Sequence, residues 1–379
     1  MRVAKRRCNF AAFVFAGTMA VSSLSPAAET FVDSLEAIRT KHQTPALAAA
    51  AFIDGKVVDV TAVGVRKVGD KTPVSNKDLW HIGSCTKAMT STLAAMVVEE
   101  GKLRWDSTVG EVFPEKRGTM NVGWAEVTLE QLLSHHAGAP GKAPEHLWAE
   151  AWKRAGTPRQ QREAFTFGLL KLPQEAPAGT KYIYSNQGYS IAGTMLEKTM
   201  NQPWEKMMKE RLFKPLGMKS ADFGAPGNPG RVDQPWGHSG TPGALTAHEP
   251  GPNADNPPSI GPGGTVHCSI SDFARFAGRH ALGARGPNDL LKKEGSWAKL
   301  HTPAEGQKYA FGWGISNRDW ANGTTLSHNG SNTMWFAVMW VAPERGAAFV
   351  AATNTASEGA EQACDDAVAA LIARHLKGS

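Results

Sequence analysis

Ser84 and Lys87 lie three residues apart in the run Ser-Cys-Thr-Lys, and these two side chains could do nucleophilic chemistry. A serine hydroxyl is a weak nucleophile at neutral pH unless a base accepts its proton. A lysine whose pKa is lowered by burial can be that base. Because residues three apart share one face of a helix, a helix beginning near Ser84 would bring hydroxyl and amine together. The alternative is a helix N-cap serine followed by a solvated lysine.

The residues after Ser84 have the pattern of an amphipathic helix that ends at Gly101. Apolar residues recur at intervals of three to four and form one stripe: Cys85, Met89, Leu93 and Met96. Ser84 and Lys87 lie off that stripe, so we expect the helix to bury one face and to present the pair along its edge. Cys85 lies on the stripe, which favours a buried apolar cysteine over a reactive thiol.

Two further short patterns carry groups that could assist such a pair. Tyr184 and Asn186 stand two residues apart. A phenol can relay a proton, and a carboxamide can hold the lysine or a substrate carbonyl. His328 begins the run His-Asn-Gly, shortly before a strong strand candidate at 335–341. Each pattern is short, and an ordinary aromatic, turn or strand-end residue is the alternative at each position.

Ser-x-x-Lys, Tyr-x-Asn and His-x-Gly in this order resemble the signature of the serine β-lactamase and penicillin-binding-protein superfamily. The resemblance is to the branch that contains class C β-lactamases, soluble DD-carboxypeptidases, D-aminopeptidases and family VIII esterases. It runs from about Phe31 to the C-terminus. Other runs agree with it, including Leu-Leu-Ser-His-His-Ala-Gly at 132–138 and Gly-Gly-Thr at 263–265. Joint occurrence in order is far more specific than any one motif.

The resemblance implies roles for these side chains. Ser84 would be the nucleophile, Lys87 its general base, and Tyr184 the group that passes a proton to the leaving group. Asn186 would position Lys87 or a substrate amide.

The resemblance further implies an oxyanion site and a substrate preference at the third motif. The backbone N–H groups of Ser84 and of Ser331, which follows Gly330, would stabilise the oxyanion. His328 stands where class C β-lactamases carry lysine. A lysine keeps its charge and attracts the β-lactam carboxylate, whereas a histidine is largely neutral and acts more as a hydrogen-bond donor. This replacement disfavours efficient β-lactamase activity.

The function that the resemblance implies is an exported serine acyl hydrolase, which cleaves an ester or amide through an acyl-enzyme on Ser84. Esterase or D-peptidase-like activity ranks above β-lactamase activity. A penicillin-binding or cell-wall regulatory module with little turnover is the alternative from another class, and a metal-dependent hydrolase is a distant third. The partner would be a small-molecule or peptide acyl substrate, including one derived from peptidoglycan. The oligomeric state is not indicated.

Residues 1–28 resemble a secretory signal peptide, with Arg2, Lys5, Arg6 and Arg7 before an apolar run and Ser-Pro-Ala-Ala at the end. We therefore expect a periplasmic or secreted protein with no membrane span after cleavage; an uncleaved anchor is the alternative. The formal charge of the whole chain is +6. Removing these four basic residues leaves about +2. No Lys/Arg cluster with interleaved aromatics follows, so we expect no nucleic-acid partner.

Three cysteines follow residue 28, namely Cys85, Cys268 and Cys364. They are odd in number and lack metal-ligand spacing, so at least one thiol should be free. The chain contains no His-Glu-x-x-His, and we expect neither a metal nor a cofactor. It also contains no Gly-x-Ser-x-Gly run, which argues against an α/β-hydrolase.

Strand patterns lie near both ends of the chain, with helical and irregular patterns between them. Strands are expected at 46–52, 57–65, about 311–315, 336–341 and 347–352, and flanking helices at roughly 30–42 and 359–376. The fold class is therefore α/β with an inserted, mostly helical lobe. The resemblance implies that the sheet is antiparallel and flanked by helices. We expect one hydrolase domain at 29–379, with an α/β lobe at about 29–105 and 295–379 and the insertion at about 106–294.

Two segments of the insertion carry signals of their own. Thr128-Leu129-Glu130-Gln131 matches a helix capping box, with Gly138 as a later stop, and we expect the segment around His135 and His136 to be scaffold. Residues 224–264 are rich in glycine and proline. We expect them to form a long irregular segment that lines the acyl-substrate cleft.

Overall fold

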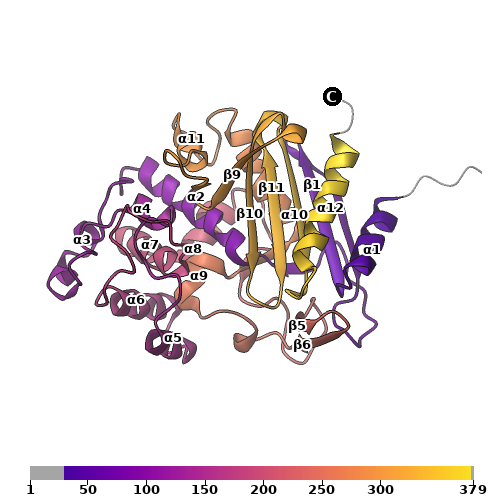
Figure 1. The fold of residues 1–379 in the computed structure, drawn as a ribbon, viewed down its shortest axis with the longest axis horizontal. Coiled ribbons are helices and arrows are strands. Elements are labelled where there is room, and N and C mark those ends of the chain that lie inside the picture. Colours follow the sequence, from indigo (N-terminus) through magenta and orange to yellow (C-terminus); the bar gives the residue numbers. More distant parts are fainter. Residues whose placement is uncertain (1–29, 377–379) are drawn as a thin grey trace, which may run out of the picture.

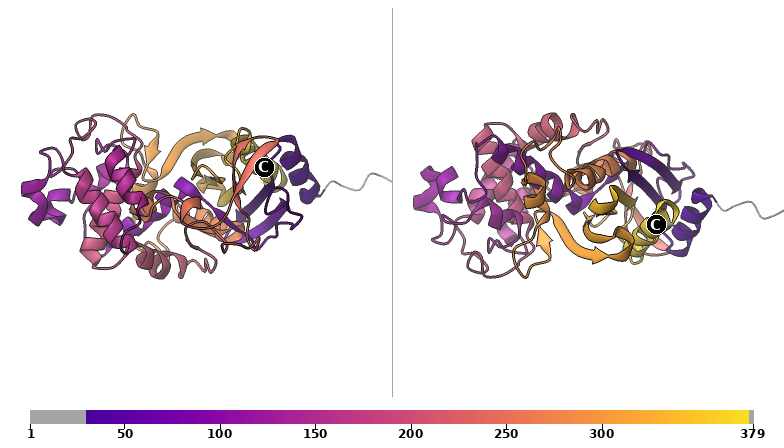
Figure 2. Two further views of the ribbon diagram at one scale, coloured as in Figure 1. Left: turned by 90° about the horizontal axis from the view of Figure 1, so that it is seen from below. Right: turned by 90° about the horizontal axis from the view of Figure 1, so that it is seen from above.

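A computed structural model describes residues 30–376 of the chain. The expected signal peptide at 1–28 lies outside the described residues. A sheet region occupies one end of the molecule's long axis and a helical region the other (Figures 1 and 2). Between residues 30 and 376, no helix is long and apolar enough to cross a membrane.

Seven strands form one antiparallel sheet in the order β2-β1-β12-β11-β10-β9-β8. Their bounds are β1 (Ala46–Ile53), β2 (Lys56–Gly64), β8 (Tyr309–Ala310), β9 (Trp313–Arg318), β10 (Gly323–Ser331), β11 (Phe336–Ala342) and β12 (Ala347–Thr353). Strands from both ends of the chain are neighbours, with Ala49 opposite Ala351. The five expected strands are present, and the predicted fold class is confirmed.

Helices cover both faces of this sheet. Helix α10 (Ile270–Gly283) packs on one face, and α1 (Phe31–Lys41) and α12 (Ala360–His375) pack on the other (Figure 1). Double coverage explains why β1 reads Ala-Leu-Ala-Ala-Ala-Ala-Phe-Ile, a continuous apolar run without alternation. The packing is close, because a Cβ at Gly278 of α10 would lie 2.2 Å from the Phe52 ring.

Strand β10 was not indicated by the sequence, because its second half holds asparagine, glycine and serine, which strands disfavour. Its pairing with β9 ends where Ser327 meets Gly314, while its pairing with β11 continues to Ser331. The far edge of residues 328–331 therefore faces the turn η1 (Gly83–Cys85), which packs against it.

The helical region is built from short and medium helices around α2 (Figure 1). Their bounds are α2 (Thr86–Glu99), α3 (Val109–Val112), α4 (Leu129–Leu133), α5 (Glu145–Trp152), α6 (Pro158–Leu169), α7 (Asn186–Met200), α8 (Trp204–Met207), α9 (Gly261–Gly264) and α11 (Ser296–His301). Shorter 3-10 or π turns are η2 (Pro114–Thr119), η3 (Met208–Phe213), η4 (Pro252–Ala254), η5 (Pro258–Ile260), η6 (Asp319–Ala321) and η7 (Pro343–Arg345). The predicted capping box of α4 is confirmed by reciprocal hydrogen bonds between Thr128 and Gln131.

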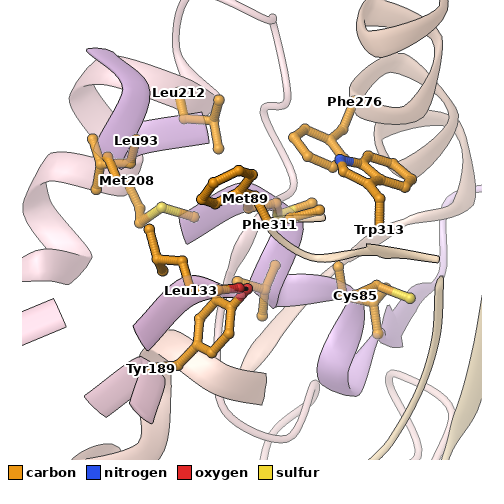
Figure 3. Packing of buried hydrophobic residues seen from close by; sticks show 14 of the residues in the cluster. Cys85, Met89, Leu93, Leu133, Tyr189, Met208, Leu212, Phe276, Phe311 and Trp313 are labelled. Carbon is orange, nitrogen blue, oxygen red and sulfur yellow. Dashed lines mark hydrogen bonds between the residues drawn. The ribbon is translucent and has the colours of Figure 1, made fainter. Parts of the chain in front are cut away.

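Helix α2 differs from the amphipathic helix that the sequence predicts. Every residue from Thr86 to Val97 is buried, so the helix has no exposed edge there. Figure 3 shows Met89 and Leu93 facing Met208 and Leu212 of the helical region, with Phe276 and Trp313 on the sheet side. The apolar stripe was read correctly, but small and hydroxyl-bearing residues fill the other faces, and these also pack in an interior. Lys87 is consequently inside the protein.

The segment at 224–264 is more ordered than the sequence predicts. It contains a hairpin of β5 (Gly237–Thr241) and β6 (Ala244–His248), followed by η4, η5 and α9. Gly243 turns the hairpin with φ +82°. Two further strands after and before this segment, β7 (Val266–Ser269) and β4 (Asp222–Phe223), pair in a small sheet with β3 (Leu79–His81). The irregular prediction was wrong for the hairpin, because its glycines and prolines also mark a tight turn.

Helix α10 covers a face of the main sheet although its residues fall within the range 106–294 assigned to the insertion. The division of the chain into lobes at those boundaries stays a prediction.

A buried ion cluster joins three helices of the helical region. Arg162 of α6 donates to Glu197 of α7 and Glu205 of α8, at 2.9 Å each, and to the Pro258 carbonyl at 2.7 Å. Burial alone would lower the pKa of the Arg162 guanidinium, but the two carboxylates overcome this and raise it. The cluster therefore fixes η5, which leads directly into α9.

Replacing the buried arginine should destabilise this region strongly. Arg162→Met leaves Glu197 buried without its partner, and we expect a loss of about 3–5 kcal/mol in the free energy of unfolding. Arg104→Met, which breaks exposed ion pairs with Asp106 and Glu111, should change it far less, because solvent screens these charges. Urea unfolding followed by circular dichroism measures both. Equal losses in the two variants would contradict the prediction.

Candidate active site

Ser84 lies in η1, the turn that links strand β3 to helix α2. Because β3 pairs with β7 and α2 is buried, both flanks of the turn are held rigidly. Lys87 follows one helical turn later, and its Nζ lies 3.1 Å from the Ser84 Oγ. The fold therefore brings together the hydroxyl and the amine of the Ser-x-x-Lys motif.

The Lys87 amine has three hydrogen-bond partners, and none of them is charged. Its Nζ lies 2.5 Å from Asn186 Oδ1, 2.7 Å from the Gly263 carbonyl and 3.1 Å from Ser84 Oγ. The amide and carbonyl oxygens can only accept hydrogen bonds, whereas the serine hydroxyl can also donate. A protonated Lys87 can donate to all three partners. A neutral Lys87 has two N–H donors and one lone pair, so it can donate to the two oxygens and accept from the Ser84 hydroxyl.

Burial lowers the pKa of Lys87 to about 7. The cause is removal of the amine from water, since no carboxylate is among its hydrogen-bond partners. Two aromatic rings complete the surroundings, with the Tyr184 and Tyr189 centroids 4.8 and 5.4 Å from Nζ. A large share of the lysine is thus unprotonated at neutral pH and able to accept a proton.

Tyr184 lies just before Ser185, the N-cap of helix α7. Burial raises the pKa of Tyr184, and the nearby Ser84 hydroxyl only partly offsets this effect. The phenol therefore stays protonated at neutral pH. It can relay a proton, but it does not serve as a phenolate base.

His135 holds Tyr184 in place, a role that the sequence did not reveal. The His135 ring lies 4.4 Å from the Tyr184 ring between centroids. His135 also binds the residues on both sides of Tyr184: its carbonyl accepts from the Ile183 N–H at 2.8 Å, and its Nδ1 accepts from the Ser185 N–H at 3.1 Å. The segment is scaffold, as predicted, but scaffold that orients a functional side chain.

All four tyrosines of the chain surround this histidine. Their ring centroids lie 4.4 to 5.6 Å from that of His135, for Tyr182, Tyr184, Tyr189 and Tyr309. Burial lowers the pKa of His135, and the nearby Lys87 lowers it further. The histidine is therefore neutral and adds no positive charge beside Lys87.

Two glycines allow β10 to approach the turn that carries Ser84. A Cβ at Gly330 would lie 2.2 Å from the Ile82 carbonyl and 2.5 Å from the Ser84 nitrogen. A Cβ at Gly83 would lie 2.4 Å from the Ser331 nitrogen, and its φ of +48° is itself unfavourable for other residues. The backbone nitrogens of Ser84 and Ser331 thus converge beside the hydroxyl, as two donors to one oxyanion must.

His328 is placed beside this site, but not as a free donor. Its Nδ1 donates to the Asn329 carbonyl, and its Nε2 lies 3.2 Å from the Tyr309 hydroxyl. Burial and the neighbouring Lys87 lower the pKa of His328 to about 3. The neutral ring has only one N–H, so Nε2 accepts from Tyr309. In this arrangement both ring nitrogens of His328 contact protein groups. That His328 donates to substrate stays a prediction.

Two cavities flank the Ser84 site. The first, which we call the tyrosine cavity, has a volume of about 320 Å³ and is lined by Tyr182, Tyr184, Tyr309, Gly314, Ser327, His328, Asn329, Val338, Trp340, Glu361 and Asp365. The second, of about 330 Å³, includes Asn186, Gln187, Asn256 and Ile260 in its lining. Asn256 and Ile260 belong to the segment 224–264, which supports its predicted place along the cleft.

The family model described as Beta-lactamase matches residues 29–374. The chain belongs to the β-lactamase family. It is a serine hydrolase of that family, and the resemblance inferred from the three motifs is confirmed.

One sequence relative and two solved structures align with most of the chain. Penicillin-binding protein 4 of Amycolatopsis lactamdurans is 29% identical over 331 residues, which cover 85% of this chain and 84% of the relative. The octameric penicillin-binding protein homologue from Pyrococcus abyssi shares the fold at a TM-score of 0.71 and 22% identity, covering 91% of this chain and 79% of that one. The D-amino acid amidase from Ochrobactrum anthropi SV3 has a TM-score of 0.71 and 18% identity, covering 90% and 99%.

The seven predicted site residues lie around one point of this β-lactamase-family fold. Ser84 lies in η1 and Lys87 in the first turn of α2, and Tyr184 and Asn186 lie on either side of the N-cap of α7. The last three lie in β10, namely His328, Gly330 and Ser331. Sequence reasoning missed His135 and the Gly263 carbonyl as partners. The runs at 132–138 and 263–265 contain these two residues and agree with the family resemblance, but no rule of sequence spacing places them beside Ser84.

The three cysteines among residues 30–376 are free and buried. Burial raises the pKa of the Cys85 thiol, which keeps it protonated next to the serine. The interpretation of Cys85 as a buried apolar residue is confirmed.

Gly330→Ala should damage the site by pushing β10 away from Ser84. We expect kcat/KM for an activated ester such as 4-nitrophenyl acetate to fall by about 100-fold or more, comparable to the loss of an oxyanion donor. Gly118→Ala is the control, because a Cβ there meets nothing within 4 Å.

Thermal unfolding should accompany the kinetics, since the added methyl also strains the core by about 1–3 kcal/mol. A folded Gly330→Ala protein with unchanged turnover would contradict the importance of this close approach.

Proposed function

We propose that this chain is an exported serine acyl hydrolase, which cleaves an ester or amide through an acyl-enzyme on Ser84. The observation that carries the proposal is the position of the buried Lys87 amine, 3.1 Å from the Ser84 hydroxyl and with only uncharged partners. In its neutral form this amine can accept the serine proton. Export to the periplasm or outside the cell is supported by the pattern of residues 1–28.

In the proposed acylation step, Lys87 accepts the proton of Ser84 as its oxygen attacks the carbonyl. The backbone N–H groups of Ser84 and Ser331 stabilise the oxyanion. Tyr184 passes a proton to the leaving group, and Asn186 holds Lys87 in place. Water then attacks the acyl-enzyme, with the same groups acting in reverse. Lys87 and Tyr184 both contact Ser84, so their titrations are coupled and apparent pKa values belong to the pair.

Esterase or D-peptidase-like activity fits this site better than β-lactamase activity. A substrate carboxylate would meet neutral His328 where a lysine would attract it, so charge pairing is lost. Support for amide substrates comes from the fold likeness to a D-amino acid amidase and from the relative named penicillin-binding protein 4. A substrate derived from peptidoglycan fits the same class.

Activity should rise with pH through a pKa near that of Lys87. The pKa is lowered to about 7, so the amine is protonated and inactive below this pH and free to accept a proton above it. His328 does not titrate in this range, because its pKa is about 3. We expect kcat/KM for a non-ionising ester to reach half its maximum near pH 7. A rise of kcat/KM centred instead near the ordinary lysine pKa of about 10.4 would contradict the assignment of Lys87 as the base.

The function is tested by intact-mass measurements on purified protein with benzylpenicillin and with 4-nitrophenyl acetate. We expect an acyl adduct that peptide mapping places on Ser84 and that Ser84→Ala abolishes together with ester turnover. Residual turnover of the variant within about tenfold of wild type, a barrier change under about 1.4 kcal/mol, would exclude Ser84 as nucleophile. A lasting adduct without turnover of any ester or D-peptide would favour a penicillin-binding module.

A further inference from the structure

The tyrosine cavity is both aromatic and acidic. Tyr182, Tyr309 and Trp340 contribute rings to its lining, and Glu361 and Asp365 contribute carboxylates. No lysine or arginine among residues 30–376 lines it, and its one histidine is neutral. Aromatic faces and carboxylates are the two groups that together recognise ammonium ions in proteins.

The two carboxylates come from the first turns of helix α12 and lie four residues apart, on one helix face. Glu361 accepts from the Asn329 side chain at 3.3 Å, and Asp365 accepts from the Trp340 ring N–H at 3.3 Å. Neither forms an ion pair with any residue from 30 to 376. The hydrogen-bond donors to both carboxylates are therefore uncharged, and no positively charged side chain of residues 30–376 forms an ion pair with either one.

The charge balance around Asp365 points the same way. Burial raises the pKa of its carboxyl, the Trp340 hydrogen bond lowers it, and the nearby carboxylates of Glu361 and Asp366 raise it. The Arg318 guanidinium lies over the Trp340 ring, 5.5 Å from its centroid, and only partly offsets these charges. A bound cation would relieve this excess of negative charge.

The cavity opens on the side of Ser84 where Tyr184 stands. Tyr184 and Tyr182 both line it, and these residues are 38% and 44% exposed. In the proposed mechanism Tyr184 passes its proton to the leaving group, so the substituent beyond the leaving atom extends into this cavity. The acyl part must then lie on the other side, toward Asn186 and the second cavity.

We propose that the leaving group of the substrate carries a cation, an ammonium or quaternary amine, held between the aromatic rings and Glu361 and Asp365 of the tyrosine cavity. This inference rests on the proposed function. In acylation the bond from Ser84 Oγ to the carbonyl carbon forms, the bond to the leaving atom breaks, and the serine proton goes to the leaving group. Water then releases the acid and restores Ser84.

Matched thioesters test the proposal, with acetyl and phenylacetyl as acyl groups. One leaving group is thiocholine and the other is its neutral isostere 3,3-dimethylbutanethiol. We expect wild type to prefer the cationic thioester by about tenfold or more in kcat/KM. The double variant Glu361→Gln/Asp365→Asn should bring the preference close to one, with the neutral thioester unchanged within about twofold.

Glu358→Gln serves as the charge control, because it removes an exposed carboxylate outside the cavity. It should keep the preference, and thermal unfolding of each variant verifies folding. Equal turnover of both thioesters by wild type, or a preference that survives in the double variant, overturns the inference alone. Failure of every thioester to turn over or to label Ser84 overturns the proposed function and the inference with it.

Discussion

The burial of one amine among uncharged acceptors is the constraint on which the rest of the site depends. A lysine paired with a carboxylate would keep its proton, and a solvated lysine would do the same. Lys87 is fully buried, and its hydrogen-bond partners among the described residues are an amide oxygen, a peptide carbonyl and a hydroxyl, with no carboxylate. The fold must bring helices α2, α7 and α9 together around this point, which explains why α2 is buried on all sides.

The second constraint is the approach of a strand edge to the turn that carries the nucleophile. Two backbone segments meet only because Gly83 and Gly330 lack side chains. Strand β10 leaves β9 after Ser327, and its freed edge runs past η1. The sheet thus has two roles along one strand: its first half completes the core, and its second half faces the reacting centre.

The strands that are apolar could be predicted from the sequence. The site residues could be predicted where they lie a few positions apart in one motif. Both ends of the chain were recognised as strands because β1, β11 and β12 are apolar runs, and Ser84 with Lys87 was recognised because three residues span one helical turn. Strand β10 was not predicted, because the asparagine, glycine and serine in its second half have low strand propensity. These residues lie at the site instead. The partners of Lys87 and Tyr184 were not predicted for a different reason. Gly263 and His135 reach them from 176 and 49 residues away, through contacts that only the tertiary fold creates.

The Arg162 cluster and the Gly263 carbonyl are linked through a few residues of backbone. Arg162 fixes η5, η5 continues into α9, and α9 supplies an acceptor to Lys87. Any local opening of this short stretch would admit water to the amine and return its affinity for protons to that of an ordinary lysine. Heat inactivation of this enzyme would then begin as a hydration event at one side chain, while the sheet and most helices are still intact.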